Sequence, residues 1–417
     1  MPTISFFTFG CKLNQAETIV LKEKFYVQGF SIVPFNSQAD FYLINACAVT
    51  QKAEKEVRQA IHQIKRQHPN SQLIVAGCLT KQIIKSEQAQ VDLWIENKDK
   101  KNIYQLVLKN LIQSSSRFKS TDSELEKDNQ RTRALIKIQD GCQHYCTYCI
   151  VPYLRQKIYS QPLNKIIQEI KEKEKQGFHE VVLVGANISL YNDQGLNLSS
   201  LLEKILDQTK ISRLRISSLW PTAIDQELLS LIKKNSRLCS HLHLSIQSAC
   251  DKILLSMGRN YKQKQLKQII AKLDKIPNLS LTADIIVGFP GEKESNFQET
   301  YQFIKWAKFL KIHVFRFSPR PGTKAYLLKN QVPDQVKQTR AKILRNLSEQ
   351  IAEEKRKKYF TQILPVLFES KQGSYWSGLT PNYLKVFIKT NKDLSNKIIN
   401  LKLTGLYQDG LKGKIFI

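Results

Sequence analysis

The sequence of 417 residues contains no long hydrophobic run. Nowhere do about 18 apolar residues follow one another, which is the least that a membrane-spanning helix needs. The first residues, MPTISFFTFGCKLNQ, have neither the basic start nor the apolar stretch of a secretory signal peptide. We therefore expect no membrane partner and a cytoplasmic location. In a reducing compartment the eight cysteines are not expected to form a disulfide framework. Metal binding or redox chemistry is therefore the favoured role for them.

Acidic residues are scarce relative to basic ones. The chain has 36 Asp and Glu against 64 Lys and Arg, a formal net charge of +28, and the excess is concentrated in residues 131–359. Such a charge suits a polyanionic partner such as RNA, although a lysine-rich surface that only keeps the protein solvated has the same composition. Charge alone does not separate RNA from DNA or from an anionic membrane surface.

Residues 1–115 alternate short β-rich runs with helical patterns. The runs ISFFTFGC, FYLINAC and QLIVAGC are each followed by a stretch with helical periodicity, of which residues 51–69 show the clearest apolar stripe. Strand and helix in alternation predict an α/β domain with a parallel sheet and covering helices, of the flavodoxin-like kind.

Three cysteines occupy matching places in this domain. Cys11, Cys47 and Cys78 each come directly after a predicted strand and a small residue. Because the carboxyl ends of parallel strands share one edge of an open sheet, where ligand crevices form, the three thiols could meet around one ligand. Burial of each cysteine as a small hydrophobic side chain is the simpler alternative.

Residues 116–133 are polar and lack apolar periodicity, which is typical of a linker. Six β-rich runs separated by helical patterns then fill residues 134–358: ALIKIQD, EVVLVGA, RLRISSL, HLHLSIQ, LTADIIVG and IHVFRFS. Repeated βα units of about 30 to 35 residues predict a parallel barrel or a doubly wound sheet. Six units are fewer than the eight of a full barrel, so we expect a partial (βα)6 barrel whose open side admits a large substrate.

Residues 359–417 show period-two β patterns and turn residues but no pattern of helix length. This predicts a small antiparallel barrel of roughly five strands. Tyr375, Trp376, Tyr383 and Phe387 are interleaved with basic residues and could stack on RNA bases. Filling the core of the barrel is the alternative role for the same aromatic side chains.

A second group of cysteines lies in the stretch IQDGCQHYCTYCIVPYLR. Cys142, Cys146 and Cys149 form a C-x3-C-x2-C run with no fourth cysteine nearby in the chain. Such a run can ligate three irons of a 4Fe-4S cluster or three positions around zinc, and His144 inside it keeps zinc open. The run follows the first barrel strand, at the face where barrel enzymes carry out chemistry, and a cluster with one open iron fits that place better.

With these motifs the chain resembles the methylthiotransferases of the radical S-adenosylmethionine (SAM) superfamily. The C-x3-C-x2-C run after a first strand is the superfamily signature, and further matching stretches follow in order along nearly the full chain: TFGCKLNQAET, INACAVT, VAGC, RLRISSLWPTAI, HLHLSIQSACD, TADIIVGFPGE and FSPRPGT. The resemblance implies an N-terminal three-cysteine domain, a radical SAM partial barrel and a C-terminal RNA-binding barrel of the TRAM type. RLRISSL and VFRFSPRPGT look most like the branch acting on N6-threonylcarbamoyladenosine (t6A) at tRNA position 37, beside the anticodon.

The family's activity, which the resemblance implies for this chain, is the addition of a methylthio group to C2 of that base by a radical mechanism. Two 4Fe-4S clusters would be held by the two cysteine triplets, and the cluster of the barrel triplet would bind and cleave SAM. The cluster of the N-terminal triplet would present the methylated sulfur, whose methyl group comes from a second SAM. No catalytic residue beyond the cluster ligands is implied. Since an aromatic C–H bond is too inert for general-base chemistry at neutral pH, a radical cofactor makes physical sense.

The resemblance also suggests SAM contacts and partners. Tyr148 matches an aromatic position near the adenine of SAM, while Gly185 and Gln247 end the second and fourth predicted barrel strands. Local packing is the alternative role for each of them. The implied partners are the tRNA anticodon arm and an electron donor of the flavodoxin or ferredoxin type.

Three other functions stay open. Two further branches of the family act on N6-isopentenyladenosine in tRNA and on an aspartate of a ribosomal protein. A zinc-containing RNA-binding protein without enzymatic activity is the alternative of a different class. The two remaining cysteines, Cys239 and Cys250, match no cluster position and are expected to be buried thiols.

Overall fold

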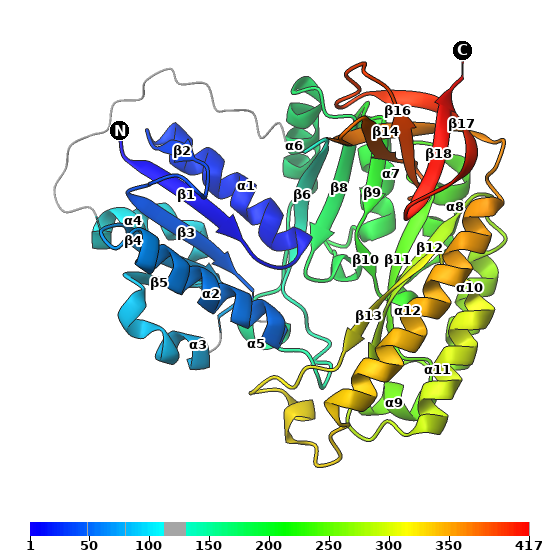
Figure 1. Cartoon of the computed structure of the whole chain (residues 1–417), viewed down its shortest axis with the longest axis horizontal. Coiled ribbons are helices and arrows are strands. Elements are labelled where there is room, and N and C mark those ends of the chain that lie inside the picture. The colour runs from blue at the N-terminus through cyan, green and yellow to red at the C-terminus, as the bar shows by residue number, and fades with distance from the viewer. Residues whose placement is uncertain (48, 80, 112–130, 417) are drawn as a thin grey trace. The chain divides into compact units, whose positions relative to one another are not determined.

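The computed structural model describes residues 1–47, 49–79, 81–111 and 131–416, which form two compact units (Figure 1). The first unit comprises Met1–Asn129, Asp140–Tyr159 and Ser318–Tyr326, and the second comprises Gln130–Gln139, Ser160–Phe317 and Leu327–Ile417. The predicted linker, 116–133, lies outside the described residues as far as residue 130. The domain boundaries given above stay a prediction.

The first unit is built on a five-stranded parallel sheet with the strand order β2-β1-β3-β4-β5. Its strands are β1 (Thr3–Thr8), β2 (Ser31–Val33), β3 (Phe41–Ala46), β4 (Gln72–Gly77) and β5 (Leu93–Glu96). This order is that of flavodoxin-like folds, so the predicted N-terminal architecture is confirmed. Sequence analysis did not find β2 and β5, because strands of three and four residues are too short to show an alternating pattern.

Helices cover both faces of this sheet. One face packs against α1 (Lys12–Val27) and α4 (Ile103–Leu111), and the other packs against α2 (Gln51–Gln67) and α3 (Lys81–Ser86). The apolar stripe expected in residues 51–69 faces the sheet, with Val57, Ala60, Ile61 and Ile64 all buried. β3 and β4 give alternate residues to the two cores, as strands buried on both faces do.

The second unit contains the six strands predicted for the partial barrel. They are β6 (Arg133–Asp140), β8 (Glu180–Gly185), β9 (Arg213–Ile216), β11 (His241–Gln247), β12 (Ser280–Val287) and β13 (Lys311–Arg316). They belong to two sheets, β7-β6-β8-β9 and β10-β11-β12-β13, which also include the two-residue strands β7 (Tyr159–Ser160) and β10 (Ser218–Leu219). The predicted strand RLRISSL is therefore divided at Ser217, and each part pairs with a different sheet.

Helices connect successive strands of the second unit. They are α6 (Leu163–Lys175), α7 (Leu198–Gln208), α8 (Gln226–Lys234), α9 (Asp251–Ser256), α10 (Gln263–Leu273), α11 (Glu294–Ala307) and the long α12 (Asp334–Lys357). Side-chain caps begin two of them, since Asn197 accepts from Ser200 N (2.9 Å) and Asp225 accepts from Leu228 N (2.7 Å). The long helix α12 runs along β13 in Figure 1, and its Ser348 hydroxyl accepts a hydrogen bond from Ile312 N at 3.0 Å.

The C-terminal residues form a closed five-stranded barrel with the order β14-β15-β16-β18-β17. The strands are β14 (Ile363–Gln372), β15 (Tyr375–Leu379), β16 (Lys385–Lys389), β17 (Ile398–Tyr407) and β18 (Gly410–Ile415). The predicted small barrel is confirmed, and its pairing is antiparallel except between β16 and β18, which are parallel. Within the parts of the chain that the structure describes, no helix combines the length and the apolar character needed to cross a membrane.

Candidate functional site

Cys11, Cys47 and Cys78 lie at one edge of the parallel sheet in the first unit. They follow the neighbouring strands β1, β3 and β4. Cys11 is the exposed N-cap residue of α1, whereas Cys47 and Cys78 are buried. Cys78 N donates to the carbonyl oxygen of Ala46 at 3.2 Å, which ties the ends of β3 and β4 together.

The surroundings of Cys47 show how tightly its side chain is enclosed. Burial raises the pKa of the Cys47 thiol to about 12, with smaller opposing effects from a backbone hydrogen bond at Val49, which lowers it, and from Cys78 and Cys11, which raise it. Gly10 has a φ of +94°, and a Cβ atom on it would lie 2.6 Å from Cys47 Sγ. The loop that leads to Cys11 therefore touches the Cys47 sulfur, and only glycine fits at residue 10.

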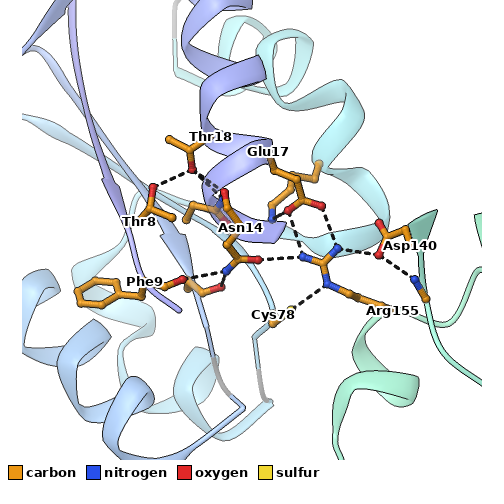
Figure 2. Close-up of polar contacts among 12 residues, drawn as sticks. Thr8, Phe9, Asn14, Glu17, Thr18, Cys78, Asp140 and Arg155 are labelled. Atoms are coloured by element: carbon orange, nitrogen blue, oxygen red, sulfur yellow. Dashed lines mark hydrogen bonds and ion pairs between the residues drawn. The ribbon is translucent and has the colours of Figure 1, made fainter. Parts of the chain in front are cut away.

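Asn14, one turn into α1, braces the backbone of this edge (Figure 2). Its Nδ2 donates to the carbonyl oxygens of Phe9 (3.0 Å) and Ala46 (2.9 Å), which lie just before Cys11 and Cys47. Asn45 Nδ2 donates in turn to the Asn14 carbonyl oxygen at 2.8 Å. Since Asn14 is buried, these bonds fix the two cysteine-bearing segments against the start of the helix.

A buried guanidinium completes the edge. Arg155 Nε donates to Cys78 Sγ at 3.3 Å, and its terminal nitrogens donate to Asn14, to both carboxylate oxygens of Glu17 and to Asp140 (Figure 2). Burial would lower the pKa of Arg155, but the charges of Cys78 and Glu17 outweigh burial and raise it well above its usual value. The guanidinium is therefore always charged where it meets the sulfur.

The second cysteine group lies on the segment between β6 and the short helix α5 (Val151–Leu154), also in the first unit. Cys146 is buried, while Cys142 and Cys149 are half-buried, and Cys149 N donates to the Cys146 carbonyl oxygen at 2.9 Å. Gly141 begins the segment with a φ of +77°, and a Cβ atom on it would lie 2.5 Å from the carbonyl oxygen of Lys157. The two ends of the segment therefore meet closely at its base.

The three candidate SAM contacts lie in both units. Tyr148 is half-buried between Cys146 and Cys149 in the first unit. In the second unit, Gly185 ends β8 beside Gln139, whose carbonyl oxygen would lie 2.9 Å from a Cβ atom at residue 185. Gln247 ends β11 with a φ of +73°, a left-handed conformation that is costly for a residue other than glycine. A SAM contact stays a prediction for all three residues.

The cysteine triplets suit iron-sulfur chemistry in their donor set. Thiolates are soft ligands that select iron-sulfur clusters or zinc, and hydrogen bonds to the ligand sulfurs are a regular part of cluster sites. The bond from Arg155 to Cys78 Sγ is of this kind. Among the residues that the structure describes, no three Cys, His, Asp or Glu side chains are gathered as the ligands of one metal ion. The fit therefore rests on ligand type, on the shared sheet edge and on the supporting charge.

Two buried arginines of β9 attach the C-terminal barrel within the second unit. Arg213 donates to the carbonyl oxygens of Pro365 and Leu379, both at 2.8 Å, and Arg215 donates to two further barrel carbonyls at 3.1 and 3.3 Å. Glu180, fully buried on β8, accepts from Arg215 Nε at 2.6 Å. The stretch RLRISSL thus has a structural role in joining the barrel to the sheet.

The four aromatic residues noted in the barrel divide into two roles. Trp376 is part of the barrel core, and Tyr383 stacks on His241 with ring centroids 4.2 Å apart. Tyr375 instead stacks on Tyr407 at 4.7 Å, and Phe387 meets the same ring at 5.1 Å. Lys385 and Lys412 lie over the rings of Phe387 and Tyr407. Tyr375 and Tyr407 are half-buried, so this stacked pair has ring surface to offer RNA beside Lys412, whereas Phe387 and Trp376 are buried.

Cys239 and Cys250 are buried thiols, as expected. Burial raises the pKa of Cys239 to about 12. Cys250 Sγ donates to Glu299 and accepts from Asn296, both at 3.3 Å.

Sequence analysis missed the side chains that support the cysteines. Asn14, Glu17 and Thr18 lie on the same buried face of α1 as Leu21 and Phe25. Three polar residues at the start of an otherwise apolar helix face are a signal of a buried polar network at that end. Arg155 ends the matching stretch IQDGCQHYCTYCIVPYLR, but the stretch does not reveal its partners, which lie 77 to 141 residues away along the chain except for Asp140.

Comparisons with known proteins agree with this architecture. The model of the Radical SAM superfamily matches residues 136–304, and that of the Uncharacterized protein family UPF0004 matches residues 3–96. A solved structure of the radical S-adenosylmethionine methyltransferase TsrM from Kitasatospora setae superposes with a TM-score of 0.55 at 11% identity, covering 78% of this chain and 77% of that one. At that identity the likeness concerns the fold alone.

Two curated relatives carry the comparison further. The threonylcarbamoyladenosine tRNA methylthiotransferase MtaB of Aquifex aeolicus is 36% identical, covering 83% of this chain and 88% of the relative. The tRNA-2-methylthio-N(6)-dimethylallyladenosine synthase of Endomicrobium trichonymphae is 31% identical, covering 98% of each chain. Identity at this level over nearly whole chains, together with both family matches, means that the chain belongs to the radical SAM methylthiotransferase family.

Proposed function

We propose that this protein is a tRNA methylthiotransferase that adds a methylthio group to C2 of N6-threonylcarbamoyladenosine at position 37. The observation that carries the proposal is one buried network in which Arg155 bonds to Cys78 of the first triplet and to Asp140, two residues before the second. The higher identity to the relative named for threonylcarbamoyladenosine supports this substrate.

In this proposal each triplet ligates a 4Fe-4S cluster, with Cys142, Cys146 and Cys149 at one site and Cys11, Cys47 and Cys78 at the other. When bound, the clusters supply the electron that cleaves SAM and a site that carries sulfur, chemistry that no side chain offers. The C2 hydrogen leaves in 5′-deoxyadenosine, and a second SAM gives the methyl group.

The chain's own residues hold and shape these sites. Asn14 and Arg155 fix the backbone and one sulfur of the N-terminal triplet. Tyr148, between two ligands of the other triplet, is proposed to lie against the adenine of SAM. Gly185 lets Gln139 pack closely against the end of β8, and Gln247 ends β11 from a strained backbone; both are proposed SAM contacts.

The proposed function also implies a substrate site and partners. A base beside the anticodon lies in a loop, where unstacking is inexpensive and where proteins recognise single-stranded RNA. We assign binding of the anticodon arm to the C-terminal barrel, where the half-buried rings of Tyr375 and Tyr407 stack on each other and Lys412 lies over Tyr407. A flavodoxin or ferredoxin is the proposed electron donor, and the cytoplasm is the proposed compartment.

Matched cysteine variants test the cluster assignments. Anaerobically reconstituted Cys142→Ala should lose SAM cleavage, whereas Cys47→Ala should still form 5′-deoxyadenosine but no methylthiolated nucleoside. Cys239→Ala, the same change at a buried thiol outside both triplets, should behave like the wild type. Methylthiolated product from Cys47→Ala would contradict the role given to the N-terminal triplet. Zinc without iron in the wild type would favour the RNA-binding alternative.

The substrate is tested separately in cells. Nucleosides from tRNA of a deletion strain should lack methylthiolated t6A, and the wild-type gene should restore it where the Cys47→Ala gene does not. A relative named for dimethylallyladenosine makes N6-isopentenyladenosine the second candidate. Loss of methylthiolated isopentenyladenosine instead, or of a modified aspartate in ribosomal protein, would move the chain to another branch of the family.

A further inference from the structure

Arg155 uses every hydrogen-bond donor of its guanidinium inside the protein. A guanidinium has five N–H groups in a planar fork. One goes to Cys78 Sγ, two go to the oxygens of Glu17 at 2.9 and 3.0 Å, one goes to Asn14 Oδ1 at 2.9 Å and one to Asp140 Oδ1 at 2.7 Å. Since the side chain is 2% exposed, this arrangement leaves no choice of partner and no access for water.

The bond to sulfur is informative, because carboxylates already surround the guanidinium. A neutral thiol is a weak acceptor, whereas a charged sulfur forms a strong hydrogen bond with a cation. Lys100 Nζ also bonds to Glu17 at 2.6 Å, so two cations face the two carboxylates of Glu17 and Asp140 before any sulfur is counted. These four charges balance, so a thiolate at Cys78 would add one negative charge directly against the Arg155 guanidinium that bonds to its sulfur.

The bond from Arg155 to Asp140 lies at the base of the segment that carries the other triplet. Asp140 is the last residue of β6, and Arg155 follows α5, so the two residues bracket the segment that carries Cys142, Cys146 and Cys149. Their ion pair at 2.7 Å closes the base of this segment, where the Asp140 carboxylate also accepts from Gly141 N at 2.8 Å. The Arg155 guanidinium thus bonds to a sulfur of the first triplet and, through Asp140, joins the two ends of the segment that carries the second.

We propose that Arg155 is a positioning residue that fixes the two cysteine sites relative to each other and tunes the N-terminal one through its bond to Cys78. The proposal rests on the cluster assignments made above. A purely structural role would be that of any buried ion pair, whose replacement changes stability alone. The two roles differ in what they do to the redox behaviour of the N-terminal site and to the coupling of SAM cleavage with sulfur transfer.

The redox test uses the full chain with Cys142→Ala, Cys146→Ala and Cys149→Ala combined, so that only the N-terminal triplet is left. Its midpoint potential is measured by EPR-monitored titration with and without Arg155→Lys or Arg155→Gln. Hydrogen bonds and charge near the sulfurs set such potentials, so both changes should make the potential more negative, and Arg155→Gln more so than Arg155→Lys. Asp140→Asn, which leaves the bond to Cys78 in place, should not make it more negative.

The coupling test uses the enzyme with both triplets and measures methylthiolated nucleoside formed per 5′-deoxyadenosine. A misplacement of about 1 Å can cost about a hundredfold in rate, and we expect this ratio to fall about tenfold or more in Arg155→Lys and Asp140→Asn. The matched control is Arg340→Gln. Arg340 is equally buried and bonds to Glu292 at 2.8 Å and to Glu294 at 3.1 Å in the second unit. This change should leave both the potential and the ratio unmoved.

The outcomes separate the inference from the function on which it rests. If the triple-alanine protein binds no iron, both are overturned. If it binds iron and the Arg155 variants keep the wild-type potential and ratio, the role of Arg155 is refuted while the proposed function stands. If Arg155→Lys and Asp140→Asn yield no folded protein while Arg340→Gln folds, Arg155 is a structural residue and the proposal is equally refuted.

Discussion

Replacing Glu180 with glutamine should strongly destabilise the second unit, because it leaves two buried arginines without their counter-charge. Glu180 is fully buried, with Arg215 Nε 2.6 Å from one carboxylate oxygen and Arg213 Nη1 3.7 Å from the other. Both arginines also hold carbonyl oxygens of the C-terminal barrel. Glutamine keeps the size of the side chain, but it removes the charge and replaces one of the two oxygens that accept from Arg215 with an NH2 donor.

The size of the effect follows from this geometry. Two unit charges about 4 Å apart attract by roughly 4 kcal/mol at an effective dielectric constant of about 20, and desolvation of the buried groups offsets part of that attraction. Removing one partner of a buried pair typically costs about 3 to 5 kcal/mol, since the other charge stays buried and uncompensated. We expect a loss in this range at pH 7, which is a large part of the roughly 5 to 15 kcal/mol that stabilises a native protein.

The destabilisation by Glu180→Gln should also depend on pH, which gives a second test. Burial alone would raise the pKa of Glu180, but the charge and hydrogen bonds of Arg215, with the charges of Arg133 and Arg213, hold it below its ordinary value. A carboxyl group with a lowered pKa in the folded state stabilises the protein above its unfolded pKa of about 4.3, and this stabilisation is lost as the pH falls through the folded pKa. The difference between wild type and Glu180→Gln should therefore shrink between pH 7 and pH 3.

Denaturant titrations followed by circular dichroism measure both the loss of stability at pH 7 and its change with pH. The control is Glu353→Gln, which removes an exposed partner of Lys357 on α12 and should leave the unfolding midpoint unchanged. A loss of less than about 1 kcal/mol at pH 7, or a difference that stays constant down to pH 3, would refute the assignment of Glu180 as the counter-charge of the two arginines.

Two further predictions concern the N-terminal triplet and the RNA contact. Gly10→Ala should reduce the iron held by the triple-alanine protein well below about four per chain, because the new Cβ would lie 2.6 Å from Cys47 Sγ. Gly195→Ala, at a similar φ of +93° but with open space around it, should keep its iron, and equal losses would contradict the steric argument. Lys412→Ala should weaken tRNA binding and reduce the salt dependence of log K by about one unit, as loss of one phosphate contact does. Binding titrations at several salt concentrations check this against Lys171→Ala on α6, and identical slopes would place the tRNA elsewhere.

Much of the fold was predictable because its signals are local. The six strands of the partial barrel and the first three strands followed by cysteine each show a run of β-forming residues next to a helical pattern. The cysteines themselves needed no partner to be noticed, since few other roles explain three thiols at strand ends or a C-x3-C-x2-C run. The expectation that they ligate clusters awaits the iron measurements.

Other features depend on tertiary context and leave no local trace. RLRISSL reads as one strand, yet Ser217 divides it, because β9 pairs with β8 and β10 pairs with β11. Trp376 and Tyr383 look alike in a basic, aromatic stretch, but one fills the barrel core and the other stacks on His241. Which side of a strand faces the core of so small a barrel is decided by pairing register, and the sequence pattern specifies that register weakly.

Arg155 shows what separates a predicted ligand set from a working site. Its five donors serve four residues from three segments of the chain, so replacing any one partner takes away the acceptor of at least one donor. A buried polar group without a partner costs more free energy than one hydrogen bond contributes. Loss of one bond is therefore expected to weaken the whole buried network. Glu17 and Asn14 are therefore expected to affect Cys78 and the segment of the second triplet together. We therefore expect the two cysteine sites to depend on each other through Arg155, which belongs to neither triplet.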